Sequence, residues 1–463
     1  MDENLLKDVK DLYQKYLANK DDYQKMWDYY VGSTDIETTY PKSKFGNNRK
    51  VKANFIKKFI NEEVAFATGN SITYTRELTL DEIINGVQVP EDSVEVQLID
   101  KIMKYNPNSD AELMTNQLIF GQAMEMYYID DNMFKIRRLS PLNSYVKLDL
   151  NGNVESAIYV YQKIDDKNNT ETFINYFTSD VVYTFNADFK KINEESHYLG
   201  IIPIGYCELI DGKNNTLFND LKSIQDNLEN ILSDFANEIG DNRMSYLILK
   251  NLGLSEEQIE EIKTKNEGKE PTAQQIAETI IKYFRDNGII LMDADKEVDS
   301  DAKFLVKQIS SDVYKTMLDI TTDMIYQLSQ HINLNQQQSS NTSGVALMTR
   351  IISLRNKIKI QQNCMSKAIR TRLYCIISWI NSKFGQILDS NKVGIKYTLN
   401  VPSDDSAMAD IITKLVPQGI ISAETAIENL SFVTNAKAEH EKALKEIKDR
   451  EGSMGDVPGD PGV

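Results

Sequence analysis

The stretch from Leu217 to Ile239, LFNDLKSIQDNLENILSDFANEI, sets the character of this chain. Its apolar residues recur every three or four positions, at Leu221, Ile224, Leu228, Ile231, Phe235 and Ile239. That spacing is typical of one face of an α-helix, and at about 1.5 Å per residue the helix would be a rod roughly 35 Å long. The other sides of the rod carry one base, Lys222, and the acids Asp220, Asp226, Glu229, Asp234 and Glu238. We therefore predict a long helix with one apolar seam and an acidic remainder.

A second amphipathic helix is predicted farther along the chain, from Ser311 to His331. Its apolar stripe consists of Val313, Met317, Ile320, Met324 and Leu328. Between the two rods, residues 251–308 contain two short helical patterns and two strand-like pieces, GIILMD and KFLVKQ. The sequence thus predicts two long helices that flank a compact insertion.

The N-terminal half combines helices with a β-rich region. Helical patterns cover residues 1–30, a stretch that begins near Val51 and stops at Gly69-Asn70, and then residues 93–105 and 110–124. SITYTRE alternates like a short strand, and strand-like runs rich in aromatic and β-branched residues follow, such as MEMYYID, SAIYVYQKI and DVVYTF. We predict an α+β fold that is mainly helical.

A polar loop and a long basic helix follow the second rod. Residues 332–343, INLNQQQSSNTS, are almost uncharged and are predicted to form an exposed loop. The helical pattern from Gly344 to Phe384 contains no Asp or Glu but eight cations, Arg350, Arg355, Lys357, Lys359, Lys367, Arg370, Arg372 and Lys383. In a chain of net charge -17, such a cluster is expected to face something negative.

The C-terminal region is predicted to be a strand at Lys396–Val401 and then helices at 406–415, 422–430 and within AKAEHEKALKEIKDREG. Residues 451–463 are rich in Pro and Gly, and we expect them to be disordered.

Composition excludes several classes of protein. Affinity for duplex DNA comes mainly from Lys and Arg, so the net charge of -17 argues against a protein that wraps DNA. No run of 18 apolar residues and no signal peptide is visible, so we predict no membrane contact and synthesis in the cytoplasm. The cysteines Cys207, Cys364 and Cys375 cannot form a disulfide framework.

Motifs for catalysis or metal binding are also missing. The chain has no phosphate-binding glycine loop, no dinucleotide fingerprint and no nucleophile elbow. His197, His331 and His440 lie far apart, and the acids at 293–301 lack the glycine and the glutamate of a calcium loop. We predict no enzyme activity, no cofactor and no metal.

Several strings occur in a fixed order over roughly residues 45–450, namely NNRKVKANFIKKFI, GNSITY, FGQAMEMYYID, GIIPIGY, SDFANEIGDNRMSYLILK, TSGVALMTR and GIISAETAIENL. In their order and intervals they resemble portal proteins of tailed double-stranded-DNA bacteriophages, especially those from phages of Gram-positive hosts.

The resemblance implies the regions of a portal fold. Residues 1–216 would form the wing, and residues 217–250 and 309–331 the two stem helices. Residues 251–308 would form the clip, which docks the packaging motor or the tail connector. Residues 332–343 would be the tunnel loop, 344–401 the long basic wing helix and a strand, and 402–450 the crown.

The resemblance also implies partners and a location. The chain would be one subunit of a homo-oligomeric ring of twelve, through which double-stranded DNA passes without sequence recognition. Terminase, the head-tail connector, the major capsid protein and the scaffold protein would bind it. It would sit at the capsid vertex of the virion, after assembly in the host cytoplasm.

Three sets of residues are candidates for contact with DNA or with a neighbouring subunit. Asp220, Asp226, Glu229 and Asp234 would line the stem channel and repel phosphate; the simpler interpretation is a solvated acidic face. Gln336, Gln337, Gln338, Ser339, Ser340 and Asn341 would offer weak, exchangeable hydrogen bonds to DNA from the tunnel loop, or belong to a disordered surface loop. The third set is basic and consists of Arg350, Arg355, Lys357 and Lys359. These side chains would touch DNA or pair with acids of the next subunit, and we favour the pairing. The simpler interpretation is a solvated basic face.

Two other functions compete with a portal. A metal-dependent nuclease would need converging carboxylates, whereas the acids of this chain are spread along helices. A cytosolic coiled-coil adaptor would bury the seams of both long helices within one chain.

Overall fold

The computed structural model forms two compact units. Unit 1 consists of Met1–Thr34, Asn54–Gln225 and Asp323–Val463, and unit 2 of Asp35–Ala53 and Asp226–Thr322. Both units combine helices with strands, which confirms the predicted mixture of the two. The residues that the structure describes are 3–41, 47–88, 93–164, 168–241, 246–250, 260, 262–264, 270–276, 278–279, 282, 301–305, 311–333, 344–399, 405–428, 430, 433 and 436–454.

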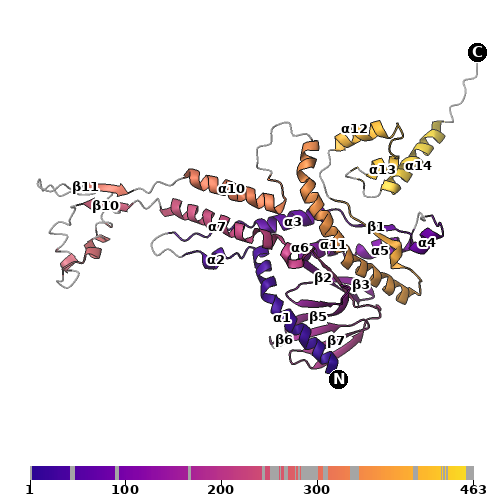
Figure 1. Cartoon of the computed structure of the whole chain (residues 1–463), viewed down its shortest axis with the longest axis horizontal. Helices are drawn as coiled ribbons and strands as arrows, with labels where there is room; N and C mark the ends of the chain where they lie inside the picture. Colours follow the sequence, from indigo (N-terminus) through magenta and orange to yellow (C-terminus); the bar gives the residue numbers. More distant parts are fainter. Residues whose placement is uncertain are drawn as a thin grey trace, which may run out of the picture. The chain divides into compact units, whose positions relative to one another are not determined.

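In unit 1, the first helix covers one face of a five-stranded antiparallel sheet (Figure 1). The helix is α1 (Glu3–Val31), and the strands lie in chain order: β4 (Ser144–Leu148), β5 (Val154–Ile164), β6 (Thr170–Phe177), β7 (Val181–Asn186) and β8 (Lys191–Ser196). Val9, Leu12 and Tyr16, at helical spacing on α1, pack against Ile158 and Ile174, which project from one side of the sheet. The alternating aromatic and β-branched runs predicted strands here, and the structure confirms them; the packing of α1 on the sheet was not predicted.

A smaller sheet packs against the larger one. Its central strand, β2 (Gln122–Asp130), pairs with β3 (Met133–Leu139) and β9 (Ile204–Glu208). The preceding helix, α6 (Ser109–Phe120), is shorter than predicted because Gly121 adopts a left-handed conformation, with φ of 76°, and ends it. A Cβ at this position would also meet the backbone of Gly212, so no larger residue fits there.

Unit 1 contains further helices. They are α3 (Phe55–Thr68), α4 (Leu80–Ile84), α5 (Val94–Met103), α11 (Gly344–Phe384), α12 (Asp405–Leu415), α13 (Ala423–Glu428) and α14 (Ala436–Met454), with short 3-10 helices at Gly212–Asn215 and Ser390–Lys392. The long helix predicted from 344 to 384 is confirmed. The predicted tail begins too early, because α14 continues to Met454; residues 455–463 lie outside the described part.

The strand predicted at 396–401 is displaced. The structure instead forms β12 (Val393–Lys396), whose residues pair antiparallel with β1 (Thr73–Arg76). This partner lies more than 300 residues away in the sequence, so the strand's position depends on tertiary pairing and not on the local alternation of KYTLNV.

A buried ion network fastens α11 to the smaller sheet. The Arg372 guanidinium, fully buried, donates from Nε and Nη2 to the two carboxylate oxygens of Glu125, each at 2.7 Å. Its Nη1 bonds Asp110 of α6. The Tyr127 hydroxyl donates to Glu125 at 2.7 Å. Arg372, predicted as one of eight unopposed cations, therefore has two carboxylate partners within its own chain.

Unit 2 contains the middle of the chain. It includes α2 (Ile36–Thr39), most of α7 (Leu217–Asp241), the antiparallel pair β10 (Tyr246–Lys250) and β11 (Asp301–Leu305), and the start of α10 (Ser311–Ser329). Phe235 of α7 and Tyr314 of α10 have ring centroids 4.9 Å apart, so the two helices pack together there. The first stem helix, predicted over 217–250, is too long, because α7 ends at Asp241 and residues 246–250 form a strand. Most of the predicted clip, 251–308, lies outside the described residues.

Candidate functional site

The predicted tunnel-loop residues, Gln336, Gln337, Gln338, Ser339, Ser340 and Asn341, lie outside the described residues. The structure does describe the residues that lead into this loop and the helix that follows it. A cluster of polar side chains joins the two. We call it the loop anchor, and it consists of Glu63, Ser329, His331, Lys357 and Gln361.

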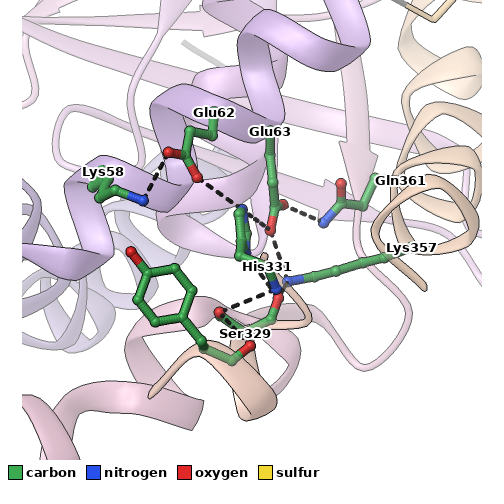
Figure 2. Close-up of polar contacts among 8 residues, drawn as sticks. Lys58, Glu62, Glu63, Ser329, His331, Lys357 and Gln361 are labelled. Atoms are coloured by element: carbon green, nitrogen blue, oxygen red, sulfur yellow. Dashed lines mark hydrogen bonds and ion pairs between the residues drawn. The ribbon is translucent and has the colours of Figure 1, made fainter. Parts of the chain in front are cut away.

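The loop anchor is centred on the buried carboxylate of Glu63 (Figure 2). Lys357 Nζ donates to Glu63 Oε1 at 2.7 Å, and Gln361 Nε2 donates to Glu63 Oε2 at 2.8 Å. Lys357 Nζ also donates to the backbone oxygen of Ser329 at 3.3 Å. Helix α3 thus holds both the end of α10, just before the loop, and the α11 turns that follow the loop.

His331 completes the anchor as a buried, neutral imidazole. Its ring stacks on Phe59, with centroids 4.2 Å apart. Nδ1 lies 3.0 Å from the Ser329 carbonyl, which can only accept, so Nδ1 carries the proton. Nε2 lies 3.8 Å from carboxylate oxygens of both Glu62 and Glu63. Burial, and then the charge of Lys357, lower the pKa of His331 from 6.5 to about 3.

This histidine gives the loop anchor a testable pH dependence. The unfolded chain takes up a proton near pH 6.5, whereas the folded chain resists it down to about pH 3, so stability falls as pH drops through that window. We expect the free energy of unfolding at pH 5 to be about 2 kcal/mol below its value at pH 7. Chemical denaturation of the wild type and of His331→Gln at both pH values measures this difference.

In His331→Gln, which keeps a side-chain donor but cannot titrate, we expect most of that difference to vanish. Both measurements are made at or above pH 5, because Asp and Glu carboxylates change their protonation mainly below that pH. An equal pH response in both proteins would show that His331 does not stay neutral in the folded chain.

Sequence reasoning did not identify the loop anchor, although one signal was present. Glu63 occupies a position on the face of α3 formed by Ile56, Phe59 and Ile60, all of which are buried. A charge on an apolar helix face indicates a buried ion pair. The pattern does not reveal its partner, because Lys357 lies 294 residues away.

The predicted acidic lining of the first stem helix is only partly exposed. Asp220 and Asp234 are exposed and Asp226 is half-buried, whereas Glu229 is fully buried. The Asp234 carboxylate accepts a hydrogen bond from the Tyr40 hydroxyl at 2.6 Å. The assignment of Glu229 to a channel lining is therefore wrong, while the roles of Asp220, Asp226 and Asp234 stay predictions.

Glu229 is buried because an extended segment runs along α7 in unit 2. The backbone N–H groups of Arg49, Val51 and Ala53 donate to side chains of α7 four residues apart, namely Asn237 at 2.7 Å, Ser233 at 2.9 Å and Glu229 at 3.1 Å. Two residues of extended chain and four of helix each span about 6 to 7 Å, so the two periods match. This side of α7 is a polar ladder, which the apolar seam alone did not predict.

Of the four cations predicted to contact DNA or a neighbouring subunit, Lys357 is used internally, as Arg372 of the same helix is. Lys357 pairs with Glu63 of its own chain, so its assignment to a contact between subunits is wrong. Arg355 and Lys359 are exposed on α11, and their proposed partners on a neighbouring subunit stay predictions. The side chain of Arg350 lies outside the described part.

Helix α10, predicted to be the second stem helix, has its predicted apolar stripe partly exposed. Its five residues, Val313, Met317, Ile320, Met324 and Leu328, are between 43% and 58% exposed. A neighbouring row faces inward instead, with Thr321, Ile325 and Ser329 buried. Helix α10 therefore has two adjoining rows, and only one is covered by its own chain.

Within the described residues, no group of three or more His, Cys, Asp or Glu side chains is arranged to hold a metal ion. None of the helices described there combines the length and the apolar character needed to cross a membrane.

The described residues combine a buried polar cluster that joins α3, α10 and α11 with a half-exposed apolar stripe on α10. The chain belongs to the family described as Phage portal protein, SPP1 Gp6-like, whose model matches residues 9–453.

Two curated relatives carry the name portal protein. That of Bacillus phage SPP1 is 23% identical over 99% of this chain and 87% of its own length. That of Clostridium phage phiCD119 is 23% identical over 67% of this chain, and the match spans 62% of its own length. Among solved structures, a chain from the neck of an empty GTA particle, computed with C6 symmetry, matches 80% of this chain and 86% of its own. The sequence identity of that pair is 10%, and its TM-score is 0.43.

Proposed function

We propose that this protein is the portal subunit of a tailed phage, which forms a closed ring of twelve copies at the capsid vertex and catalyses no reaction. The observation that supports a ring is the solvent-exposed apolar stripe of α10. Five large apolar side chains in one row, each about half exposed, are costly in water and favour burial against another chain. Membership of the portal family favours this function over the adaptor and the nuclease.

The ring would act as a passage for double-stranded DNA during packaging and ejection. A conduit must not hold DNA tightly, because each phosphate that a cation neutralises adds affinity that movement would have to break. The net charge of -17 and the exposed acids Asp220 and Asp234 support a surface of this kind. The loop 332–343 would touch DNA through uncharged side chains, while the loop anchor holds its base.

The other regions would supply contacts with virion proteins. We assign residues 1–216 to the wing, 251–308 to a clip that docks terminase or the head-tail connector, and 402–450 to the crown. The major capsid and scaffold proteins would bind the outside of the ring, in the virion and in the host cytoplasm during assembly.

Imaging purified protein in negative stain tests the ring, and an α10 variant tests the stripe. We expect closed rings of the wild type, and mostly monomers of Ile320→Asp/Met324→Asp, because two charges would have to be buried in the contact. Lys315→Asp, on an exposed side of the same helix outside the stripe, is the matched control and should still form rings. A wild type that stays monomeric under all conditions contradicts the proposed function; rings from the double variant contradict the role of the stripe.

A further inference from the structure

A second exposed apolar surface lies far from α10 in the sequence. It consists of residues 77–88, ELTLDEIINGVQ, which include α4, and we call it the α4 arm. Leu80 and Ile84 are 79% and 80% exposed, and Ile83 and Val87 are also exposed. Isolated exposed apolar residues are ordinary, but four within eight positions mark a contact surface.

The α4 arm is fixed to the rest of unit 1 by ion pairs and hydrogen bonds, so its apolar residues are exposed in a well-defined position. Arg76 Nη2 donates to both carboxylate oxygens of Glu82 at 2.8 Å, and Lys392 Nζ lies 3.0 Å from Glu82 Oε1. Thr79 and Glu82 form a capping box at the start of α4. The hydrogen bonds from Arg76 lower the pKa of Glu82 to about 2, so this fastening persists across the physiological range.

The charge of the α4 arm indicates the chemistry of its partner. The arm contains Glu77, Asp81 and Glu82 and no Lys or Arg. Glu82 is used in the fastening, and Glu77 forms an exposed ion pair with Arg370 of its own chain at 3.6 Å; both Glu77 and Asp81 remain exposed beside the apolar residues. A complementary surface would therefore be apolar and basic.

The first half of α11 carries a surface of that kind. Ile352 and Ile360 are 54% and 49% exposed, and between them Arg355 and Lys359 are exposed on the same side of the helix. Residues 344–384 contain no acid, so the surface has no negative charge of its own. We call Ile352, Arg355, Lys359 and Ile360 the α11 row.

We infer that the α4 arm of one copy docks on the α11 row of the next copy in the ring. Both surfaces belong to unit 1, where α4 lies at one edge (Figure 1). The apolar residues of both are exposed in the single chain, so the two surfaces do not cover each other. Two different, complementary surfaces are what a head-to-tail ring requires of each subunit. This inference rests on the proposed function and names the second contact of the same ring.

Charge reversal tests the inference with full-length protein. One variant, Arg355→Glu/Lys359→Glu, makes the α11 row acidic, and the other, Glu77→Lys/Asp81→Lys, makes the α4 arm basic. Each alone would set like charges against each other, and we expect the fraction of protein in rings to fall at least about tenfold. Lys445→Glu/Lys448→Glu on α14 makes the same change of charge at exposed positions elsewhere and should form rings as the wild type does.

Mixing the two variants is the decisive experiment. In an equimolar mixture, acidic rows would meet basic arms and basic rows would meet acidic arms, so alternating rings should form again. The quadruple variant, with both surfaces reversed, should also form rings by itself. Thermal unfolding of each variant shows whether it is folded.

The outcomes separate this inference from the proposed function. Wild-type rings with no loss in either variant overturn the inference and leave the ring intact. Loss in both variants without recovery in the mixture or in the quadruple variant also overturns it. A wild type that forms no rings overturns the proposed function itself.

Discussion

Replacing Glu125 by alanine is expected to lower the free energy of unfolding by about 3–5 kcal/mol. Glu125 accepts two hydrogen bonds from the fully buried Arg372 guanidinium. Without it the guanidinium stays buried with Asp110 as its remaining acidic partner, and the Tyr127 hydroxyl loses one of its two acceptors. Urea denaturation followed by circular dichroism measures the loss.

Two comparisons isolate the buried pair. Glu155→Ala removes an exposed pair with Lys147 and should change the free energy of unfolding by less than about 1 kcal/mol. Glu125→Ala/Arg372→Met removes both charges, so it should be less unstable than the sum of the single variants, with a coupling of about 1–3 kcal/mol. If Glu125→Ala is no more harmful than Glu155→Ala, the network does not hold α11 on the sheet.

Replacing Lys357 by methionine is expected to destabilise the loop anchor by a similar amount, about 3–5 kcal/mol. The variant leaves the buried Glu63 carboxylate with its hydrogen bond from Gln361 and removes the bond from Lys357 to the Ser329 carbonyl. We expect faster hydrogen exchange at Ser329–His331 and in the α11 turns around 357. Hydrogen exchange with mass spectrometry locates the change.

Lys359→Met is the matched control for this prediction. It makes the same replacement two residues along α11, where the side chain is exposed, and should alter stability by no more than about 0.5 kcal/mol. Lys357→Met/Glu63→Gln should recover part of the loss, because no uncompensated charge then remains buried. Exchange in Lys357→Met that matches Lys359→Met would show that this pair does not fasten the loop.

These contacts matter for function because they define what can move in the proposed ring. The loop 332–343 follows the α10 end at one side and precedes α11 at the other, and the loop anchor ties both to α3. The α10 stripe and the apolar residues of the α11 row are about half exposed in the single chain, so both would be available to neighbouring copies in the proposed ring.

The sequence by itself determined the long helices, the β-rich region and their order. The spacing of apolar residues predicted α7, α10 and all of α11, and the alternating aromatic runs predicted the β-rich region. Such patterns depend on residues a few positions apart, which share a helix face or a side of a strand whatever the rest of the chain does. The order of the family-like strings also identified the family.

Only the tertiary structure decided which faces are covered and which charges are used. Periodicity marks an apolar or acidic row but does not say what lies against it, so the α10 stripe turned out exposed and Glu229 buried. The partners of Glu63 and Arg372 lie roughly 250–300 residues away along the chain. A buried charge is stable only beside its counter-charge, and that proximity is created when distant segments fold together.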